Sequence, residues 1–460
     1  MACAAPQSER DRYRVILLSA RGTQVLLVPS ASNFSFPEIA IPTFQRIAEN
    51  LRAAMRANWS QEVLCLSALP CASDGVPRYF VAATLQQDAA AGNSVWVPVT
   101  SVEPDSFTDS TDYEALRSSL VRCCQESTKS SDSPFAKLCW FEELNAWIAR
   151  VIKPSGLRLT GAFRQLNASP TFSLIRFETD GPAVWFKAVG EPNLHEFSIT
   201  RLLAQLFPDY LPAVLAFHPA VHGWLMKSAG DGTLREATDV NSWRLAVSRL
   251  ANLQMESINR TNQLLAAGCR DLRTQTLLDC CDPFFENVAT LMGQQPNTPP
   301  APLSRQELSD LGSTVKHALR SLRGAGIPET LGHSDLNPGN ILVEQDRYGF
   351  TDWAEAHVGH PFFSFEYLRR AFYRLLAEDA DTGSILASAY FNGWKSAVPR
   401  HDAKEALRYA PLVAAFAYAV HVARWRDSEK IRQANIAAWL RSLTRTMQQE
   451  ANRLREHIQQ

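Results

Sequence analysis

Short apolar runs and two kinds of periodicity divide the chain into three stretches. In the first, β-branched and aromatic residues between Gly, Pro, Ser and Asn predict strands at residues 14–18, 24–28, 63–69, 79–85 and 95–99. Apolar residues recur at steps of three and four over residues 44–55, which predicts a helix, and a further helix is predicted over 112–124. The polar residues 127–134 have the composition of a linker. We therefore expect a small α/β domain, ordered ββαβββα, over residues 1–130.

The second stretch is β-rich and the third is mainly helical. A helical apolar stripe over residues 135–152 is followed by predicted strands and one helix, at residues 158–163, 172–177, 183–189, 194–206 (the helix), 214–217 and 223–226. After Gly232 the pattern is mainly helical, with two short strands around Ile341 and Gly349. We expect a β-rich lobe with its linker helix over 131–229 and a helical lobe over 230–460.

Composition narrows the class of protein. The 460 residues exceed one small domain, and 46 Lys and Arg against 47 Asp and Glu give no basic excess for binding nucleic acid or an anionic membrane. The longest apolar stretch, near residues 410–420, is shorter than the roughly 20 residues of a membrane span. Nine cysteines without C-x-x-C spacing, and no apolar leader at the start, predict a cytoplasmic protein.

The densest functional pattern is the segment 333–340, HSDLNPGN, followed by TDW at 351–353. The Pro-Gly pair predicts a loop, so that the side chains of Asp335 and Asn340 can face one cavity. Asp352 follows a strand that returns the chain beside this loop. Magnesium prefers oxygen ligands and is often held by one or two carboxylates plus nucleotide phosphates, which makes Asn340 and Asp352 candidate ligands. The alternative is a turn whose Asp and Asn only cap the backbone.

These motifs resemble those of the aminoglycoside phosphotransferase and choline-kinase-like family, whose pattern is H-G-D-x-x-x-x-N and then D-W or D-x. The resemblance implies an α+β, two-lobed protein-kinase-like fold that uses ATP and Mg²⁺. It implies that Asp335 orients or deprotonates the acceptor hydroxyl, that Asn340 and Asp352 bind magnesium, and that His333 braces the loop. The sequence departs from the pattern at Ser334, where Gly is usual, and at 359–364, GHPFFS, where G-D-P-x-x-D is common.

The resemblance also implies a lysine on an upstream strand and an acid on the next helix. Lys187 lies near the end of VWFKAV, residues 184–189, which resembles the V-A-I-K strand of protein kinases. Glu196 lies nine residues further on, at the start of a predicted helix. We expect the two to pair and to serve the binding of ATP; each residue alone would be an ordinary surface charge.

A loop over the phosphates and a hinge against adenine complete the implied cofactor site. The loop QLNASPT, residues 165–171, lacks G-x-G-x-x-G, so a protein kinase is not expected. Its candidate phosphate contacts are Asn167, Ser169 and Thr171, with a plain hairpin as the alternative. Residues 224–230 have the position of the hinge, and Met226 is its candidate residue.

Four further residues near the motif have two readings each. Glu355 and Glu366 lie where an acceptor pocket could form, and acids there would suit a cationic substrate; the alternative is surface charge. His357 and His360 are three residues apart and could suggest a metal site, but no further ligand is near them in sequence. We expect both histidines to be structural.

The first domain resembles the Nudix hydrolase fold in outline. Nudix chemistry needs a helix with R-E-x-x-E-E, because several carboxylates hold magnesium on a pyrophosphate. Residues 45–52 read QRIAENLR, with Glu49 as the only acid. We therefore expect a small α/β Nudix-like domain that is not hydrolytic.

Together these patterns predict an ATP-dependent small-molecule kinase that transfers the γ-phosphate to a hydroxyl of a metabolite. A sugar, an aminoglycoside or a choline-like alcohol would all fit, and no nucleic-acid or membrane partner is expected. The competing hypothesis is a nucleotide-binding regulatory pseudokinase without turnover, which the missing glycine loop and the altered residues 359–364 keep open. A hydrolase acting through the first domain is disfavoured by the absent carboxylates.

Overall fold

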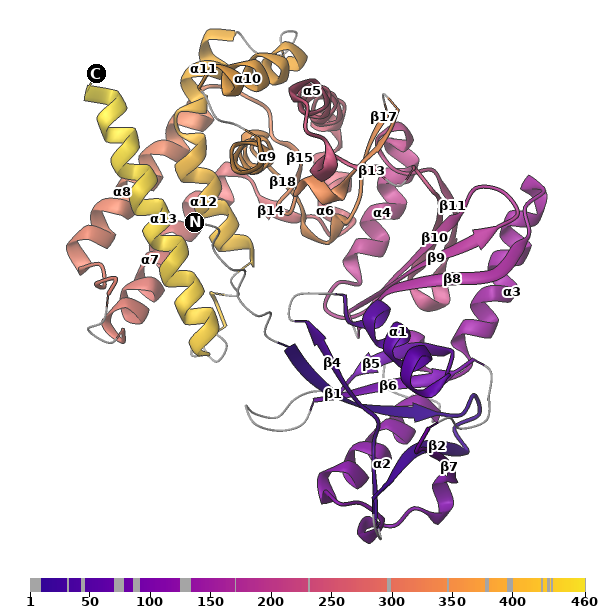
Figure 1. The fold of residues 1–460 in the computed structure, drawn as a ribbon. Coiled ribbons are helices and arrows are strands. Elements are labelled where there is room, and N and C mark those ends of the chain that lie inside the picture. Colours follow the sequence, from indigo (N-terminus) through magenta and orange to yellow (C-terminus); the bar gives the residue numbers. More distant parts are fainter. Residues whose placement is uncertain are drawn as a thin grey trace, which may run out of the picture. The chain divides into compact units, whose positions relative to one another are not determined.

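The chain has a mixed α+β structure, shown by a computed structural model as two compact units (Figure 1). Unit 1 comprises Met1–Phe197 and Ala213–Ser228, and unit 2 comprises Ser198–Pro212 and Ala229–Gln460. The described residues are 10–459 except 31–32, 43–45, 70–77, 86–91, 125–133, 170, 231, 296–298, 346, 377–379, 395–399, 423–424, 428–430 and 432. The start of the helix predicted from Phe44 and almost all of the predicted linker lie outside the described residues. Each unit is described by itself.

The N-terminal part of unit 1 is a sheet in the order β3-β2-β1-β6-β5, with β4 paired to β1 and β7 paired to β2. Its strands are β1 (Arg10–Leu18), β2 (Gln24–Ser30), β3 (Asn33–Ser35), β4 (Glu38–Pro42), β5 (Val63–Ala68), β6 (Arg78–Thr84) and β7 (Val95–Pro98). Among the described strand pairs of this sheet, β1–β6 is parallel and the others are antiparallel. Helix α1 (Ile47–Trp59) joins β4 to β5, and α2 (Ser110–Cys124) follows β7. We refer to this part as the N-terminal module.

Helix α1 packs on the sheet of this module through one face. Ala48, Leu51 and Met55 are buried at spacings of three and four residues, as the apolar pattern predicted. They join a core cluster with Leu17 and Phe80 from the strands. The helix begins at residue 47 and ends at residue 59, a few residues later than its predicted bounds.

The rest of unit 1 is a second sheet, antiparallel throughout, in the order β11-β12-β10-β9-β8. Its strands are β8 (Leu159–Ala168), β9 (Phe172–Thr179), β10 (Val184–Val189), β11 (Val214–His218) and β12 (Gly223–Lys227). Helix α3 (Trp140–Ile152) precedes this sheet, and α4 (His195–Leu206) follows β10 and continues into unit 2. The apolar stripe of α3 is buried as predicted, and the Phe141 ring stacks on Phe177 at 5.8 Å.

The two sheets of unit 1 are joined by polar contacts as well as by a shared core. The Gln165 side chain of β8 accepts a hydrogen bond from the Cys65 N–H (2.8 Å) and donates one to the Cys65 carbonyl (2.7 Å). Arg164, also on β8, forms an ion pair with Glu49 of α1 at 2.7 Å. The only acid of the QRIAENLR segment is therefore engaged with the neighbouring sheet.

Unit 2 contains two three-stranded sheets that carry the segment 330–359. One has the order β13-β16-β17 and the other β14-β18-β15. The strands are β13 (Gly232–Thr233), β14 (Arg270–Leu272), β15 (Thr330–His333), β16 (Ile341–Glu344), β17 (Arg347–Phe350) and β18 (Ala356–Gly359). The two strands predicted around Ile341 and Gly349 are thus present as the β16–β17 hairpin.

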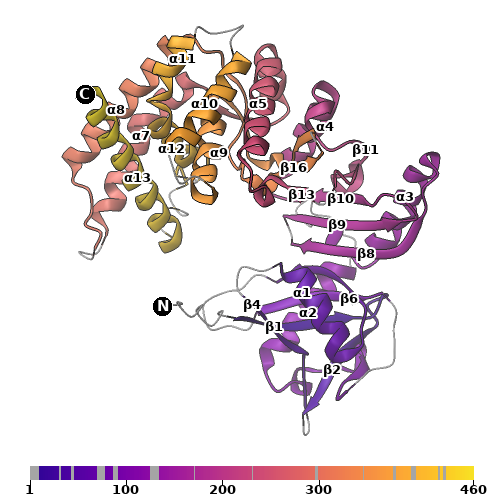
Figure 2. The same ribbon diagram turned by 45° about the horizontal axis from the view of Figure 1, so that its top comes forward.

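Helices make up most of unit 2 (Figure 2). Their buried apolar side chains form one large core cluster. The helices are α5 (Val240–Ser257), α6 (Thr261–Ala266), α7 (Thr274–Gly293), α8 (Arg305–Gly324), α9 (Phe362–Leu375), α10 (Ala380–Trp394), α11 (Arg400–Leu407), α12 (Ala410–Val422) and α13 (Ala434–Gln459). Two helix starts follow capping rules: Asp239 accepts from the Ser242 N–H, and Ser304 forms a capping box with Glu307. Among the described helices, none is both long and apolar enough to cross a membrane.

Candidate active site

The segment HSDLNPGN leaves β15 and forms a loop that ends in a short 3₁₀ turn before β16. Its Asp335 carboxylate is half-buried and has three polar neighbours. Tyr367 donates to Oδ1 at 3.0 Å, and Asn340 donates through Nδ2 to Oδ2 at 3.4 Å. The Asn337 amide lies 3.5 Å from Oδ1. These contacts hold the carboxylate in one orientation, as a group that positions an acceptor hydroxyl requires.

The β16–β17 hairpin brings Asn340 and Asp352 to one end. Ile341 pairs with Phe350 in the register of the hairpin, and the Thr351 N–H donates to the Asn340 carbonyl at 3.0 Å. Asn340 and Asp352 therefore flank the same end of the two strands. Asp352 has a left-handed backbone (φ 68°, ψ 59°), a conformation that costs a non-glycine residue roughly 1–3 kcal/mol.

The donor atoms at this end of the hairpin suit a hard divalent cation. The Asn340 amide nitrogen donates to the Asp335 carbonyl at 2.9 Å, so its Oδ1 is directed away from that bond. An amide oxygen and a carboxylate are the ligand types that magnesium takes together with nucleotide phosphates. Asn340 and Asp352 thus fit the ion that the sequence predicted for them.

His333 connects the loop to the strand that precedes Asp352. Its Nδ1 accepts from the Asp335 N–H at 3.2 Å, so that Nε2 carries the proton and donates to the Thr351 carbonyl at 3.1 Å. Burial lowers the pKa of His333, which keeps the ring neutral. The ring also lies against Trp353, with centroids 4.9 Å apart. Loss of this imidazole would release both segments at once.

The two departures from the family pattern meet beside this loop. Ser334 shares a hydrogen bond of 3.0 Å with Nδ1 of His357, and Ser364 accepts from the His333 N–H at 2.7 Å. The hydroxyl of Ser364 thus takes an architectural position on the loop, at the last residue of GHPFFS. A Cβ on Gly332 would lie 2.1 Å from Nε2 of His357, so the buried imidazole requires glycine at 332.

Gly332→Ala is expected to lower the free energy of unfolding by about 1–3 kcal/mol, because the added methyl overlaps the His357 ring. Urea denaturation of the purified variant measures this cost. In a His357→Ala background the same substitution should cost less. An equal cost in both backgrounds would show that the ring is not the obstacle.

His357 and His360 are structural in this fold. Both are buried, His357 bonds to Ser334, and Nδ1 of His360 accepts from the Phe362 N–H at 3.3 Å. Within the described part of the chain, no three or more His, Cys, Asp or Glu side chains are grouped for a metal ion. Burial lowers the pKa of each imidazole to about 3.

Because these two histidines are buried and neutral, we expect the free energy of unfolding to fall in acid. Between about pH 6.5 and 3 the unfolded chain binds a proton at each ring and the folded chain does not, so stability falls as the pH falls. Each ring contributes at most about 1.4 kcal/mol per pH unit. In urea titrations at pH 7 and pH 5, His360→Asn should lose less stability than the wild type. The exposed His317→Gln serves as control, and an unchanged difference for His360→Asn would contradict the assignment.

Lys187 and Glu196 form a buried ion pair in unit 1. Lys187 Nζ lies 2.6 Å from Glu196 Oε1, and the side chains are 7% and 2% exposed. The ammonium also lies 5.7 Å from the ring centroids of Phe172 and Trp224. Lys187 sits in the middle strand of the sheet, paired with Leu174 and Trp224, which fixes where its side chain starts.

The predicted phosphate loop is the turn between β8 and β9. Ser169 closes this turn: its N–H donates to the Phe172 carbonyl (3.1 Å), and its hydroxyl accepts from the Phe172 N–H and bonds Thr171. For Ser169 and Thr171 these contacts match the plain-hairpin alternative. Asn167 lies at the end of β8, and its buried Oδ1 has no partner among the described residues.

The predicted hinge is shorter than the segment 224–230. Residues 224–227 belong to β12, and Met226 packs in a cluster with Val189 and Trp224. The Ser228 N–H still bonds the Ala183 carbonyl at the end of the sheet. The segment that leaves the sheet therefore begins after Ser228, a boundary that the apolar pattern of the strand does not mark.

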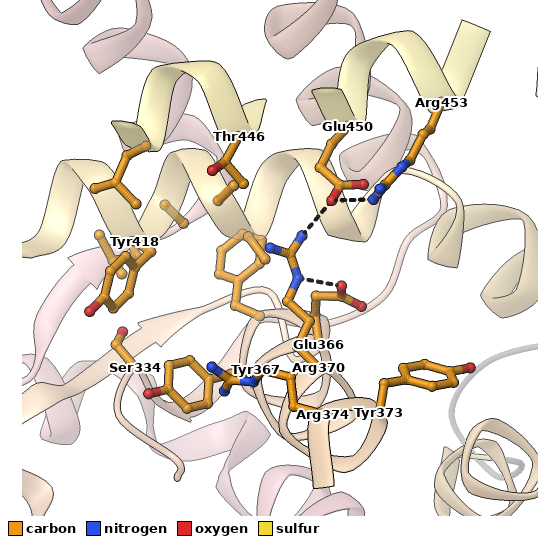
Figure 3. A pocket seen from close by; sticks show the side chains of 16 residues that line it. Ser334, Glu366, Tyr367, Arg370, Tyr373, Arg374, Tyr418, Thr446, Glu450 and Arg453 are labelled. Atoms are coloured by element: carbon orange, nitrogen blue, oxygen red, sulfur yellow. Dashed lines mark hydrogen bonds and ion pairs between the residues drawn. The ribbon is translucent and has the colours of Figure 1, made fainter. Parts of the chain in front are cut away.

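A cavity of about 580 Å³ borders the loop within unit 2 (Figure 3). Ser334 and Tyr367 contribute to its lining, and Tyr367 also holds Asp335, so the cavity adjoins the carboxylate. Its remaining lining comes from α9, α12, α13 and Leu272. Sequence reasoning missed Tyr367, although its position one residue after Glu366 on an apolar helix face was a usable signal.

For Glu366, the reading as an acid available to a cationic substrate disagrees with the structure, which gives this carboxylate two cationic partners. Glu366 is 2% exposed and accepts from Nε of Arg369 and Nε of Arg370, both at 2.8 Å. Glu355 bonds Nε2 of the buried His421. The surface-charge alternative also fails for Glu366. Arginines three and four residues after Glu366 were the sequence signal for its pairing.

Residues 283–402 match the family model described as the phosphotransferase enzyme family. This part of the chain resembles phosphotransferases. The match includes the loop with Asp335 and Asn340 and the following Asp352, and it confirms the prediction of a phosphotransferase. No curated protein matches the chain in sequence.

Solved structures of phosphotransferases and kinases resemble about two thirds of this chain at low sequence identity. The macrolide 2′-phosphotransferase of Brachybacterium faecium is 17% identical with a TM-score of 0.44, over 65% of this chain and 98% of its own. The choline kinase of Cryptosporidium parvum is 12% identical with a TM-score of 0.46, over 68% and 96%. A spectinomycin phosphotransferase, solved with ADP and spectinomycin, is 12% identical with a TM-score of 0.40, over 67% and 98%.

Proposed function

We propose that this protein is an ATP-dependent small-molecule kinase of protein-kinase-like, two-lobed fold that transfers the γ-phosphoryl group to a hydroxyl of a metabolite. The observation that carries the proposal is the loop at residues 333–340. There Asp335, oriented by Tyr367 and Asn340, adjoins a cavity, while Asn340 and Asp352 flank the same hairpin end. Phosphoryl transfer needs a carboxylate next to the space for the acceptor. It also needs oxygen ligands for the metal ion close to that carboxylate.

We propose a separate role for each of these residues. Asp335 orients the acceptor hydroxyl and takes its proton. Asn340 and Asp352 hold Mg²⁺, which supplies charge neutralisation on the phosphates when bound. Lys187, held by Glu196, places a positive charge for the α- and β-phosphates. His333 braces the loop through its two ring nitrogens.

We propose that Asn167 and Met226, at the end of its strand, also contact ATP. Ser169 would shape the turn that lies over the phosphates. The orphan Oδ1 of Asn167 supports its role, because a buried amide oxygen without a partner is costly unless a ligand or water satisfies it. We propose residues 131–229 and 230–460 as the two lobes, and the cytoplasm as the compartment.

We further propose that residues 1–130 form a Nudix-like module that does not hydrolyse nucleotides. The ion pair of Glu49 with Arg164 supports this, because the single acid of the helix already has a cationic partner. Hydrolysis of nucleoside diphosphate compounds by the purified protein, abolished by Glu49→Ala, would contradict this proposal.

Two measurements test the kinase proposal. Thermal shift with ATP and Mg²⁺ should stabilise the wild type and stabilise Asp352→Ala much less, since the metal ligand is lost. Transfer of the γ-phosphate to members of a metabolite library should then be lost in Asp335→Ala. Stabilisation that depends on Asp352, without transfer to any acceptor, would favour the nucleotide-binding regulatory pseudokinase instead. No stabilisation by ATP with Mg²⁺ would contradict both.

A further inference from the structure

The charged side chains around the cavity leave an excess of positive charge. Both lining glutamates are already paired: Glu366 with Arg369 and Arg370, and Glu450 with Arg370 (3.2 Å) and Arg453 (3.0 Å). Arg369 lies outside the cavity, so the described lining holds three arginines, Arg370, Arg374 and Arg453, against two glutamates. The lining therefore carries one positive charge more than negative ones. Asp335, where the reacting hydroxyl is expected, contacts the lining residue Tyr367.

Arg374 is the third arginine of the lining, and no acid among the described residues forms an ion pair with it. It is exposed, and the described residues offer it no hydrogen bond or ion pair. Arg370 and Arg453, in contrast, share Glu450 (Figure 3). A guanidinium without a partner at the edge of a cavity is a ready site for a carboxylate, which it can bind through two parallel hydrogen bonds.

Helix α9 carries both Arg374 and Tyr367, the residue that contacts Asp335. Tyr367, Arg370 and Arg374 follow one another at steps of three and four, so they lie along one face of the helix. Tyr367 donates to Asp335. Seven residues at about 1.5 Å each place the start of the Arg374 side chain roughly 10 Å further along the axis than that of Tyr367.

The wall between these two ends is largely apolar. Leu272, Phe363, Leu443 and three alanines of α12 line it together with the rings of Tyr367 and Tyr418. Such a surface favours a carbon skeleton over a densely charged molecule. Because both glutamates are paired, the described lining offers no unpaired acid for an ammonium group.

We propose that the acceptor is a hydroxylated organic acid, bound with its hydroxyl at Asp335 and its carboxylate at Arg374. This rests on the proposed kinase function and names its substrate class. In the reaction the hydroxyl oxygen bonds to the γ-phosphorus, and the bond from that phosphorus to the bridging oxygen breaks. ADP leaves with the electron pair of the broken bond, and the hydroxyl proton passes to Asp335. The carboxylate at Arg374 takes no part in bond making and only orients the acceptor.

The test uses a library in which each hydroxyl scaffold is present as carboxylate, primary amide and amine. The full chain is assayed with ATP and Mg²⁺ for transfer, and without ATP for thermal stabilisation by the same compounds. We expect transfer to the carboxylates, with kcat/KM about 10- to 100-fold lower in Arg374→Gln. The amides should change little in that variant. Arg320→Gln, an exposed arginine of α8 outside the cavity lining, is the matched control for the loss of one charge.

The outcomes separate the two proposals. Transfer to amines or amides in preference to carboxylates, or an equal loss for all three in Arg374→Gln, overturns the acid proposal and leaves the kinase standing. Carboxylates that stabilise the wild type and not Arg374→Gln, without any transfer, support the acid site and overturn the kinase. Neither transfer nor stabilisation by any member of the library contradicts both.

Discussion

Asp335→Asn is expected to lower kcat for phosphoryl transfer by about 10²–10⁴-fold, the range typical of losing a positioned acid or base. The amide keeps the shape of the carboxylate, and it can still accept from Tyr367, so the loop should remain folded. It cannot accept the hydroxyl proton. The measurement is steady-state transfer to the best acceptor, together with thermal shift by ATP and Mg²⁺, which should be close to the wild-type value.

The control for this variant is Asp310→Asn on the exposed surface of α8, which removes the same charge far from the loop in sequence. It should transfer phosphate at the wild-type rate. A rate for Asp335→Asn within a factor of about three of the wild type would remove Asp335 from the proton-accepting role. A lost ATP shift would show instead that the substitution damages the domain.

Lys187→Met is expected to cost about 3–5 kcal/mol of unfolding free energy, because it leaves the buried Glu196 carboxylate without its cation. The same variant should also lose transfer, since the charge proposed for the phosphates is gone. Urea denaturation gives the first effect and the transfer assay the second.

A second substitution separates these two effects. In Lys187→Met with Glu196→Leu the unpaired carboxylate is removed as well, so stability should return toward the wild-type value while transfer stays lost. If the double variant regained transfer together with stability, Lys187 would be only a structural partner of Glu196. Arg201→Met, on the same helix α4, controls for loss of one positive charge.

Much of the fold could be predicted from local pattern, and two kinds of feature were missed. Strands with β-branched residues between turn residues were found, as were the amphipathic helices α1 and α3. The strands β3 and β4 were missed because they have only three and five residues and end in a serine and a proline, which are typical of turns. The pairing of Gln165 with Cys65 joins residues 100 apart, and no periodicity reveals such a contact.

For the site, the spacing of a motif predicted more than the charge of a single residue did. The spacing of Asp335, Asn340 and Asp352 predicted a loop followed by a returning strand. The hairpin β16–β17 indeed brings Asn340 and Asp352 to the same end of its two strands. The charge of Glu366 alone suggested a cationic substrate, but its environment holds two arginines. Arg374 was overlooked because only the structure places it on the cavity, on the helix face of Tyr367.

A kinase couples the loss of the γ-phosphate from ATP to the formation of a phosphate ester. ADP and the phosphorylated acceptor are therefore followed in the same reaction, by chromatography with mass spectrometry, for the wild type and Asp335→Asn. We expect equal amounts of ADP and phosphate ester from the wild type, and about 10²–10⁴-fold slower formation of both by the variant. ADP without ester would indicate an ATP hydrolase, and absence of both from the wild type would contradict the kinase.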